Sequence, residues 1–165
     1  MKKYFLLVPV FILVLSSCGG PTQKQALAYD DAISWQFEMF GNVYAEYAVK
    51  KQNAKPQEKE DYRAYTCNQV LYFLDTANKT GKFDDDGTYI RALINYLTVV
   101  QKTMQERDGP MIQLMLKDSL MTKEDSAEAK FLSKQTLMLT DDAYLKFLSV
   151  QKKFREKNKI TEFTK

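Results

Sequence analysis

The chain has 165 residues, 45% of them hydrophobic, and its 24 basic and 21 acidic residues leave a formal net charge of +3. A charge this small gives no reason to expect a nucleic-acid-binding protein. The sequence contains no histidine, which excludes the commonest general base, imidazole metal ligands and any Cys-His or Ser-His catalytic pair.

The first eighteen residues have the organisation of an export signal. Lys2 and Lys3 precede an apolar run from Tyr4 to Leu15, which closes on Leu15-Ser16-Ser17-Cys18. A cationic start, a short apolar segment and a small-residue cleavage zone are typical of such signals. The closing residues resemble the lipobox of bacterial lipoproteins, in which a large aliphatic residue and two small residues precede the cysteine. The resemblance implies cleavage before Cys18 and attachment of lipid to its sulfur.

Two other interpretations of this segment compete with the lipobox. A transmembrane anchor needs roughly 20 apolar residues, and this run is several residues shorter. An ordinary secretory signal usually ends in an Ala-x-Ala-like site, but no alanine lies between Met1 and Cys18. Gly19, and not the aspartate that retains enterobacterial lipoproteins in the inner membrane, follows the cysteine. The resemblance therefore implies an outer-membrane lipoprotein, and we expect its domain to face the periplasm.

The mature chain is long enough for one domain. We expect residues 1–17 to be removed, residues 18–24 to form the lipidated cysteine and a tether, residues 25–160 to fold together, and residues 161–165 to form a tail. Cys67 is then the only free cysteine, and in an oxidising compartment it is expected to be either buried or paired with another chain. It shares a helical face with Val70 and Leu74, which favours burial.

Apolar residues at heptad spacing predict long helices. The first helix is expected from about Gln25 to Gln52, and the second from about Glu58 to Asn78, after Pro56. The third is expected to follow Asp84-Asp85-Asp86-Gly87 and to run to about Arg107. The apolar stripe of the first helix consists of Ile33, Phe37, Phe40, Tyr44 and Tyr47. Asp108-Gly109-Pro110 is expected to stop the third helix, because this sequence is typical of a turn.

The rest of the chain predicts a short helix and a long one. A densely apolar segment from Met111 to about Leu120 follows the expected turn, and Thr122 is placed to cap the last helix with Asp125 in an imperfect capping box. Two apolar stripes follow: Phe131, Met138 and Leu145, then Ala143, Phe147, Val150 and Phe154. Thr140-Asp141-Asp142 interrupts the first stripe and could cap a new segment, so the last helix has a possible kink or break there. The sequence predicts an all-α antiparallel bundle of four main helices plus one short helix.

Catalytic, cofactor and metal motifs do not emerge from the sequence. It has no glycine-rich phosphate loop and no nucleophile elbow. Asp84-Asp85-Asp86-Gly87 fails as a calcium loop because Lys82 and Leu93 fall on its first and last ligand positions. A carboxylate pair is the remaining possibility for an enzyme, and Glu38, beside Trp35 and Phe37, is the candidate acid of a cell-wall glycosidase.

Two weaker site predictions come from short segments. Flexible thioethers suit adaptable apolar contacts, so Met111, Ile112, Met115 and Leu116 are candidate partner-binding residues, unless the same segment closes the end of the bundle as core. Thr76, Ser119 and Ser126 each follow an aspartate and precede an aliphatic residue. These tripeptides resemble the O-glycosylation acceptor of exported proteins in some bacterial envelopes.

Three functions remain as hypotheses. The first is a non-enzymatic envelope lipoprotein, held to the membrane by lipid on Cys18, that docks onto another envelope protein as an accessory subunit of a secretion or transport complex. The second is a binding protein for an apolar or cell-wall ligand, and the third is a cell-wall glycosidase. A roomy apolar hollow between helices would favour the second hypothesis over the first.

Overall fold

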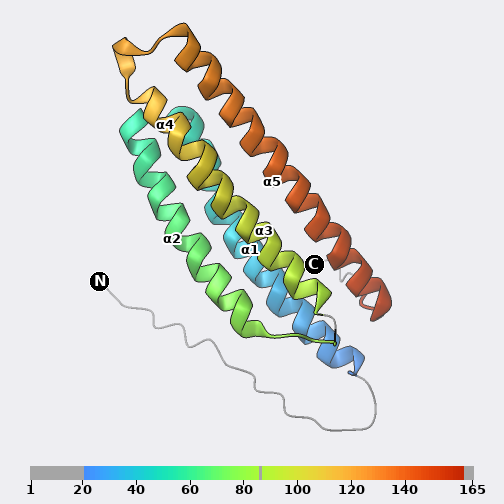
Figure 1. The fold of residues 1–165 in the computed structure, drawn as a ribbon. Helices are drawn as coiled ribbons and strands as arrows, with labels where there is room; N and C mark the ends of the chain where they lie inside the picture. Colours follow the sequence, from blue (N-terminus) through green and yellow to red (C-terminus); the bar gives the residue numbers. More distant parts are fainter. Residues whose placement is uncertain (1–20, 86, 162–165) are drawn as a thin grey trace, which may run out of the picture.

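The computed structural model describes residues 21–85 and 87–161 as an all-α bundle. Its α-helices are α1 (Gln23–Asn53), α2 (Pro56–Thr80), α3 (Thr88–Thr103), the short α4 (Gly109–Met115) and α5 (Lys123–Lys157). Figure 1 shows the four long helices alternating in direction, with α1 and α3 between α2 and α5. The predicted fold class is therefore confirmed. None of the helices in these ranges combines the length and the apolar character that crossing a bilayer requires.

Side-chain caps fix where α1 and α5 begin. The Gln25 backbone N–H donates to Thr22 Oγ1 at 3.3 Å, while Gln25 Oε1 accepts the Thr22 backbone N–H at 2.8 Å. This capping box starts α1 two residues earlier than predicted. The predicted box at the start of α5 is present, because the Asp125 N–H donates to Thr122 Oγ1 at 3.0 Å and Asp125 Oδ2 accepts the Thr122 N–H at 3.0 Å.

The main core lies between α1, α2, α3 and α5, with α3 at its centre. In α1, the predicted stripe faces this core, since Ile33, Phe40 and Tyr47 are buried. A second, smaller core lies under α4 and the start of α5, where Met111 and Ile112 pack on residues 129 and 132. The smaller core places the segment from Met111 to Met121 at the end of the bundle far from the start of α1.

The expected turn at Asp108-Gly109-Pro110 is wrong, because the backbone stays helical through it. A single π-helical turn, η1 (Met104–Asp108), joins α3 to α4, and the Gly109 N–H donates to Met104 O. Pro110 lacks an N–H and would clash with a carbonyl inside a regular α-helix. The wider π turn displaces those carbonyls, and Arg107 Nη1 donates to the Glu106 carbonyl at 3.2 Å, so the proline is accommodated without a break.

Helix α5 is unbroken, and its two apolar stripes lie on opposite faces. Thr140 Oγ1 donates to Thr136 O at 2.9 Å, which lets Thr140 sit buried inside the helix. The second stripe faces the core, where its residues Ala143, Phe147 and Phe154 are buried. The first stripe faces solvent, with exposed fractions of 59% for Phe131, 62% for Met138 and 63% for Leu145. We call these three residues the α5 outer stripe.

Matched truncations test this assignment of faces. We expect Leu97→Ala, at a fully buried position of α3, to lower the free energy of unfolding by about 2–5 kcal/mol, because it leaves a cavity. Met138→Ala should change that free energy by no more than about 0.5 kcal/mol, because the side chain is already in water. Guanidinium denaturation followed by circular dichroism measures both. A loss above 2 kcal/mol for Met138→Ala would mean that the outer stripe is buried.

Candidate functional site

Two hollows lie along α5, and the one at the far end is also lined by α1. The α5 backbone lies against α3 and α4, and that of α1 lies against α2, so α1 and α5 meet chiefly through side chains. Phe37 of α1 bridges the gap halfway along, with its ring centroid 4.3 Å from that of Phe147 and 5.6 Å from that of Tyr144. This bridge lies between two hollows, one at each end of the helices.

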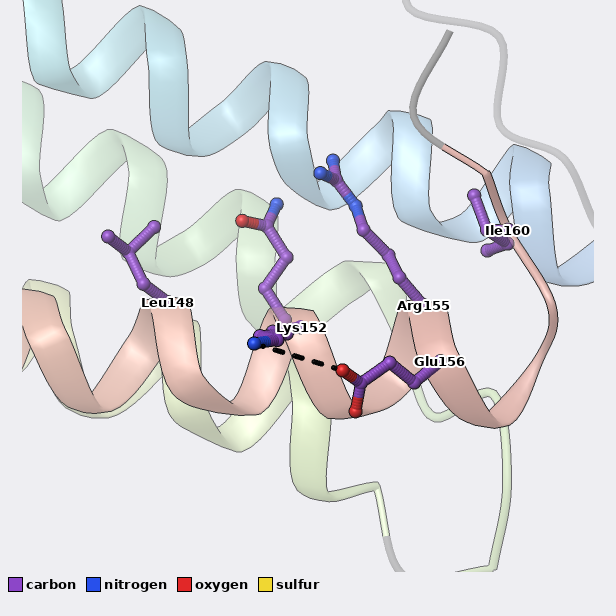
Figure 2. Close-up of a pocket in the computed structure, with 6 residues that line it drawn as sticks. Leu148, Lys152, Arg155, Glu156 and Ile160 are labelled. Atoms are coloured by element: carbon purple, nitrogen blue, oxygen red, sulfur yellow. Dashed lines mark ion pairs between the residues drawn. The ribbon is translucent and has the colours of Figure 1, made fainter.

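The proximal hollow lies near the start of α1 and the end of α5 and has a volume of about 440 Å³. Figure 2 shows Arg155 reaching from α5 toward α1, with Ile160 on the segment that follows α5. Lys152 and Glu156 also line it, and Figure 2 marks the ion pair between them, with Lys152 Nζ 3.9 Å from Glu156 Oε1. The arginine is engaged with the protein, because its Nε donates to Asp30 Oδ2 at 2.8 Å. We therefore assign this hollow a structural role.

Asp30 is the buried carboxylate that fixes this end. It is 2% exposed, and Tyr89 Oη donates to Asp30 Oδ1 at 2.7 Å. Burial is the largest cause of the raised pKa of Tyr89, and the hydrogen bond to Asp30 adds to it. With Arg155, these side chains join α1, α3 and α5. Sequence reasoning missed Asp30, although its position continues the α1 heptad stripe toward Ala26.

Asp108 is the equivalent carboxylate at the far end, and it is fully buried. Tyr47 Oη and Thr136 Oγ1 each donate to it at 2.8 Å, and Lys51 Nζ lies 3.2 Å from both of its oxygens. The π turn carries Asp108 into this cluster, whereas the sequence predicted a turn residue. Burial first and the Asp108 charge second raise the pKa of Tyr47. The cluster ties α1 and α5 to η1.

The distal hollow lies above Asp108 and has a volume of about 650 Å³. This volume lies within the range of small-molecule sites. Its apolar lining comes from Ala48, Met111, Met115, Met121, Ala129 and Leu137. Its charged lining is unequal, with Lys51, Lys59, Lys130 and Lys134 against Asp141. The hollow therefore combines an apolar surface with an excess of positive charge.

The predicted partner-binding residues divide between core and surface. Ile112 is fully buried and Met111 is 2% exposed. Both residues therefore belong to the core, which is the alternative that the sequence left open for this segment. Met111 and Met115 also line the distal hollow, and Leu116 is exposed beside it. Only part of the segment can therefore contact a ligand or partner without rearrangement.

The other predicted positions are scattered. Thr76 lies within α2, where its Oγ1 donates to Tyr72 O at 2.9 Å, and Ser119 is exposed in the 3-10 turn η2 (Asp118–Leu120). Ser126 lines the distal hollow, and Glu38 is exposed on α1 and lines neither hollow. The structure does not bring these residues together. Cys18 lies outside the described residues.

Cys67 is half-buried and reduced. Burial is the main cause that raises the pKa of its thiol, while the nearby Arg63 guanidinium, with Nη1 at 3.8 Å from Sγ, opposes it. A thiol with a raised pKa has little thiolate at neutral pH and is a weak nucleophile. The cysteine therefore gives no support to a catalytic role.

The buried tyrosines predict how stability depends on pH. Burial raises the pKa of Tyr29 and of Tyr44 to about 12, whereas an unfolded tyrosine titrates near 10. The folded chain thus holds the phenol protons more tightly, so this part of the stability is complete below pH 10 and is lost as the pH rises toward 12. Denaturant unfolding between pH 9 and 12 should show that fall. Tyr44→Phe should make it shallower, and Tyr65→Phe, at an exposed position, should not.

Comparisons with known proteins add no assignment to this geometry. No protein-family model matches the chain, and neither the curated proteins nor the solved structures gave a match. The surfaces of the bundle that bear on function are therefore the α5 outer stripe and the distal hollow.

Proposed function

We propose that this protein is a non-enzymatic envelope lipoprotein, anchored by lipid on Cys18 in the outer membrane, whose bundle docks onto a helix of another envelope protein. One observation carries the docking role, which is the α5 outer stripe. Its three apolar side chains are each more than half exposed and recur every seven residues. Residues seven apart lie on one side of a helix, so these three side chains can contact a single partner helix. The partner we infer is a helix with a complementary apolar stripe.

The position of the stripe limits where this partner can lie. At 1.5 Å per residue, Leu145 lies about 18 Å and Phe131 about 39 Å along α5 from its end at Lys157. That end lies beside the start of α1, because Gln23 Nε2 donates to Lys159 O at 2.8 Å. A lipid on Cys18 would hold this end close to the membrane surface. With the bundle axis normal to the membrane, the partner helix would contact the stripe roughly 20–40 Å from the anchoring membrane.

The flanks of the stripe carry charges that would orient the partner. Lys134 lies on one side, and Asp142 lies on the other, where it pairs with Lys146 along α5. Exposed charges such as these contribute little affinity but suppress wrong pairings. We infer an accessory subunit of an envelope complex for secretion or transport, with the apolar stripe supplying most of the contact.

A second candidate function is the binding of an apolar or cell-wall ligand in the distal hollow. The observation that favours it is the apolar lining of that hollow, which remains open beside a filled main core. The two functions use different surfaces of the bundle. A cell-wall glycosidase has less support, because Glu38 lines neither hollow.

The lipid anchor is tested by labelling. Cells grown with labelled palmitate should incorporate it into the wild-type protein, and intact-mass measurement should give a mature chain that begins at Cys18 and carries acyl groups. Cys18→Ser should abolish the label, because the acyl acceptor is the cysteine sulfur. An unlabelled wild-type chain, or one that still begins at Met1, would refute the anchor. The same mass measurement reports any hexose on Thr76, Ser119 or Ser126.

The docking role is tested by cross-linking in cells. A photoreactive residue at position 138 should give one discrete adduct, and peptide mapping should place the attachment in a heptad-patterned helix of a membrane or envelope protein. Leu145→Glu should lower the yield at least tenfold without unfolding the bundle, because its side chain is exposed. The matched control is the same photoreactive residue at the exposed position of Glu46 on α1, which should give no such adduct. Adducts only with a second copy, or equal yields at both positions, would contradict the proposal.

A further inference from the structure

The distal hollow contains a lysine whose charge the protein leaves unpaired. Lys59, near the start of α2, is 8% exposed and lines the hollow. Its Nζ has two distant contacts, the Gln52 carbonyl oxygen at 3.5 Å and Met115 Sδ at 4.0 Å. Within residues 21–85 and 87–161, no carboxylate forms an ion pair with it. A buried ammonium without a counter-ion is costly, so this position calls for an anion.

The surroundings of Lys59 define what that anion must carry. Lys51 is already committed to Asp108, whereas Lys130 and Lys134 are exposed on the rim and free to add positive charge. Met115 Sδ lies 4.0 Å from the Lys59 ammonium nitrogen. With Met111 and Met121 it forms an apolar surface of the hollow, which we call the methionine floor. A small hydrophilic anion would satisfy the charge and leave this floor bare. An acyl chain on the anion would cover it, and flexible thioethers adapt to such chains.

We propose that the distal hollow binds a single-chain acyl anion, with its carboxylate or phosphate head group on Lys59 and its chain along the methionine floor. This inference specifies the ligand class of the second candidate function and does not depend on the docking role. The lipid proposed on Cys18 does not match this ligand, because its acyl chains are esterified and carry no anionic head group for Lys59. Its attachment point is also distant, since five residues of tether reach at most about 18 Å, whereas Lys51 on the wall of the hollow lies about 42 Å along α1 from Gln23.

Photoaffinity labelling tests the proposal on the full-length protein in phosphatidylcholine nanodiscs. The probe is palmitate with a diazirine on its chain. Label should map to residues 111–137 that line the hollow. Excess palmitate should suppress it, as should a monoacyl phosphate, whereas hexadecanol and inorganic phosphate should not. Equal competition by hexadecanol would show that the hollow binds apolar chains without regard to charge, and it would overturn the proposal that the ligand is an anion. Suppression by inorganic phosphate alone, or label confined to the α5 outer stripe, would overturn the acyl-anion site.

Variants of Lys59 separate binding from folding. Lys59→Met should lower labelling at least tenfold, Lys59→Arg should retain it, and the exposed α3 control Lys102→Met should leave it unchanged. Without ligand, the melting temperature of Lys59→Met should equal or exceed that of the wild type, because an unpaired buried charge is removed. A lower melting temperature would mean that the protein already satisfies the ammonium and would overturn the proposal. Full labelling of Lys59→Met would do the same, and so would loss of label in Lys59→Arg.

Discussion

Two buried aspartates decide which face of α5 points into the bundle. The helix is apolar on both sides, because Met138 and Phe147 are nine residues, or about two and a half turns, apart. Burial of apolar area alone does not choose between such faces, since it is not directional. Asp30 binds Arg155, and Asp108 binds Thr136. A half-turn of α5 would take the Arg155 ion pair from Asp30, and losing one partner of a buried ion pair costs about 3–5 kcal/mol. It would also take the Thr136 hydrogen bond from Asp108, worth about 1.5–3 kcal/mol, although Tyr47 and Lys51 would still contact that carboxylate.

The same clusters explain why α1 and α5 remain apart. Each cluster uses long side chains, with Arg155 reaching Asp30 at one end and Lys51 and Tyr47 reaching Asp108 at the other. Stacked aromatic rings fill the space between them at Phe37. The helices are thereby held at a spacing that leaves a hollow beyond the rings at each end. The distal hollow is thus a consequence of how α5 is fastened, and its lysine-rich wall is a separate property of the sequence.

The periodic parts of the fold follow from the sequence, and the polar exceptions do not. Heptad spacing predicts α1, α2 and α3, and in α1 it also predicts the buried face, because a single apolar stripe packs against the core. In α5, two stripes compete, and their spacing carries no information about which one meets a partner outside the bundle. The π turn at Asp108 also lies beyond pattern reasoning, because it depends on a buried cluster contributed by three segments distant in sequence. Lys59 lies seven residues before the buried Thr66 and so on the same face of α2. A charged residue on a buried face is the sequence feature that could have identified Lys59 as a site residue.

An anchored bundle with these features would present its two candidate surfaces at overlapping heights, because both include residues between 131 and 141 of α5. The α5 outer stripe runs along the side of the molecule and is exposed over much of its length. The distal hollow lies at the end away from α1's first turn, beyond the reach of the proposed tether. An acyl anion bound there would therefore have left the anchoring membrane, at least in part. Because the outer stripe and the wall of the hollow belong to the same stretch of α5, with Leu137 lining the hollow and Met138 facing outward, a partner docked on the stripe would also border the mouth of the hollow. The two proposed activities thus use neighbouring surfaces of one helix.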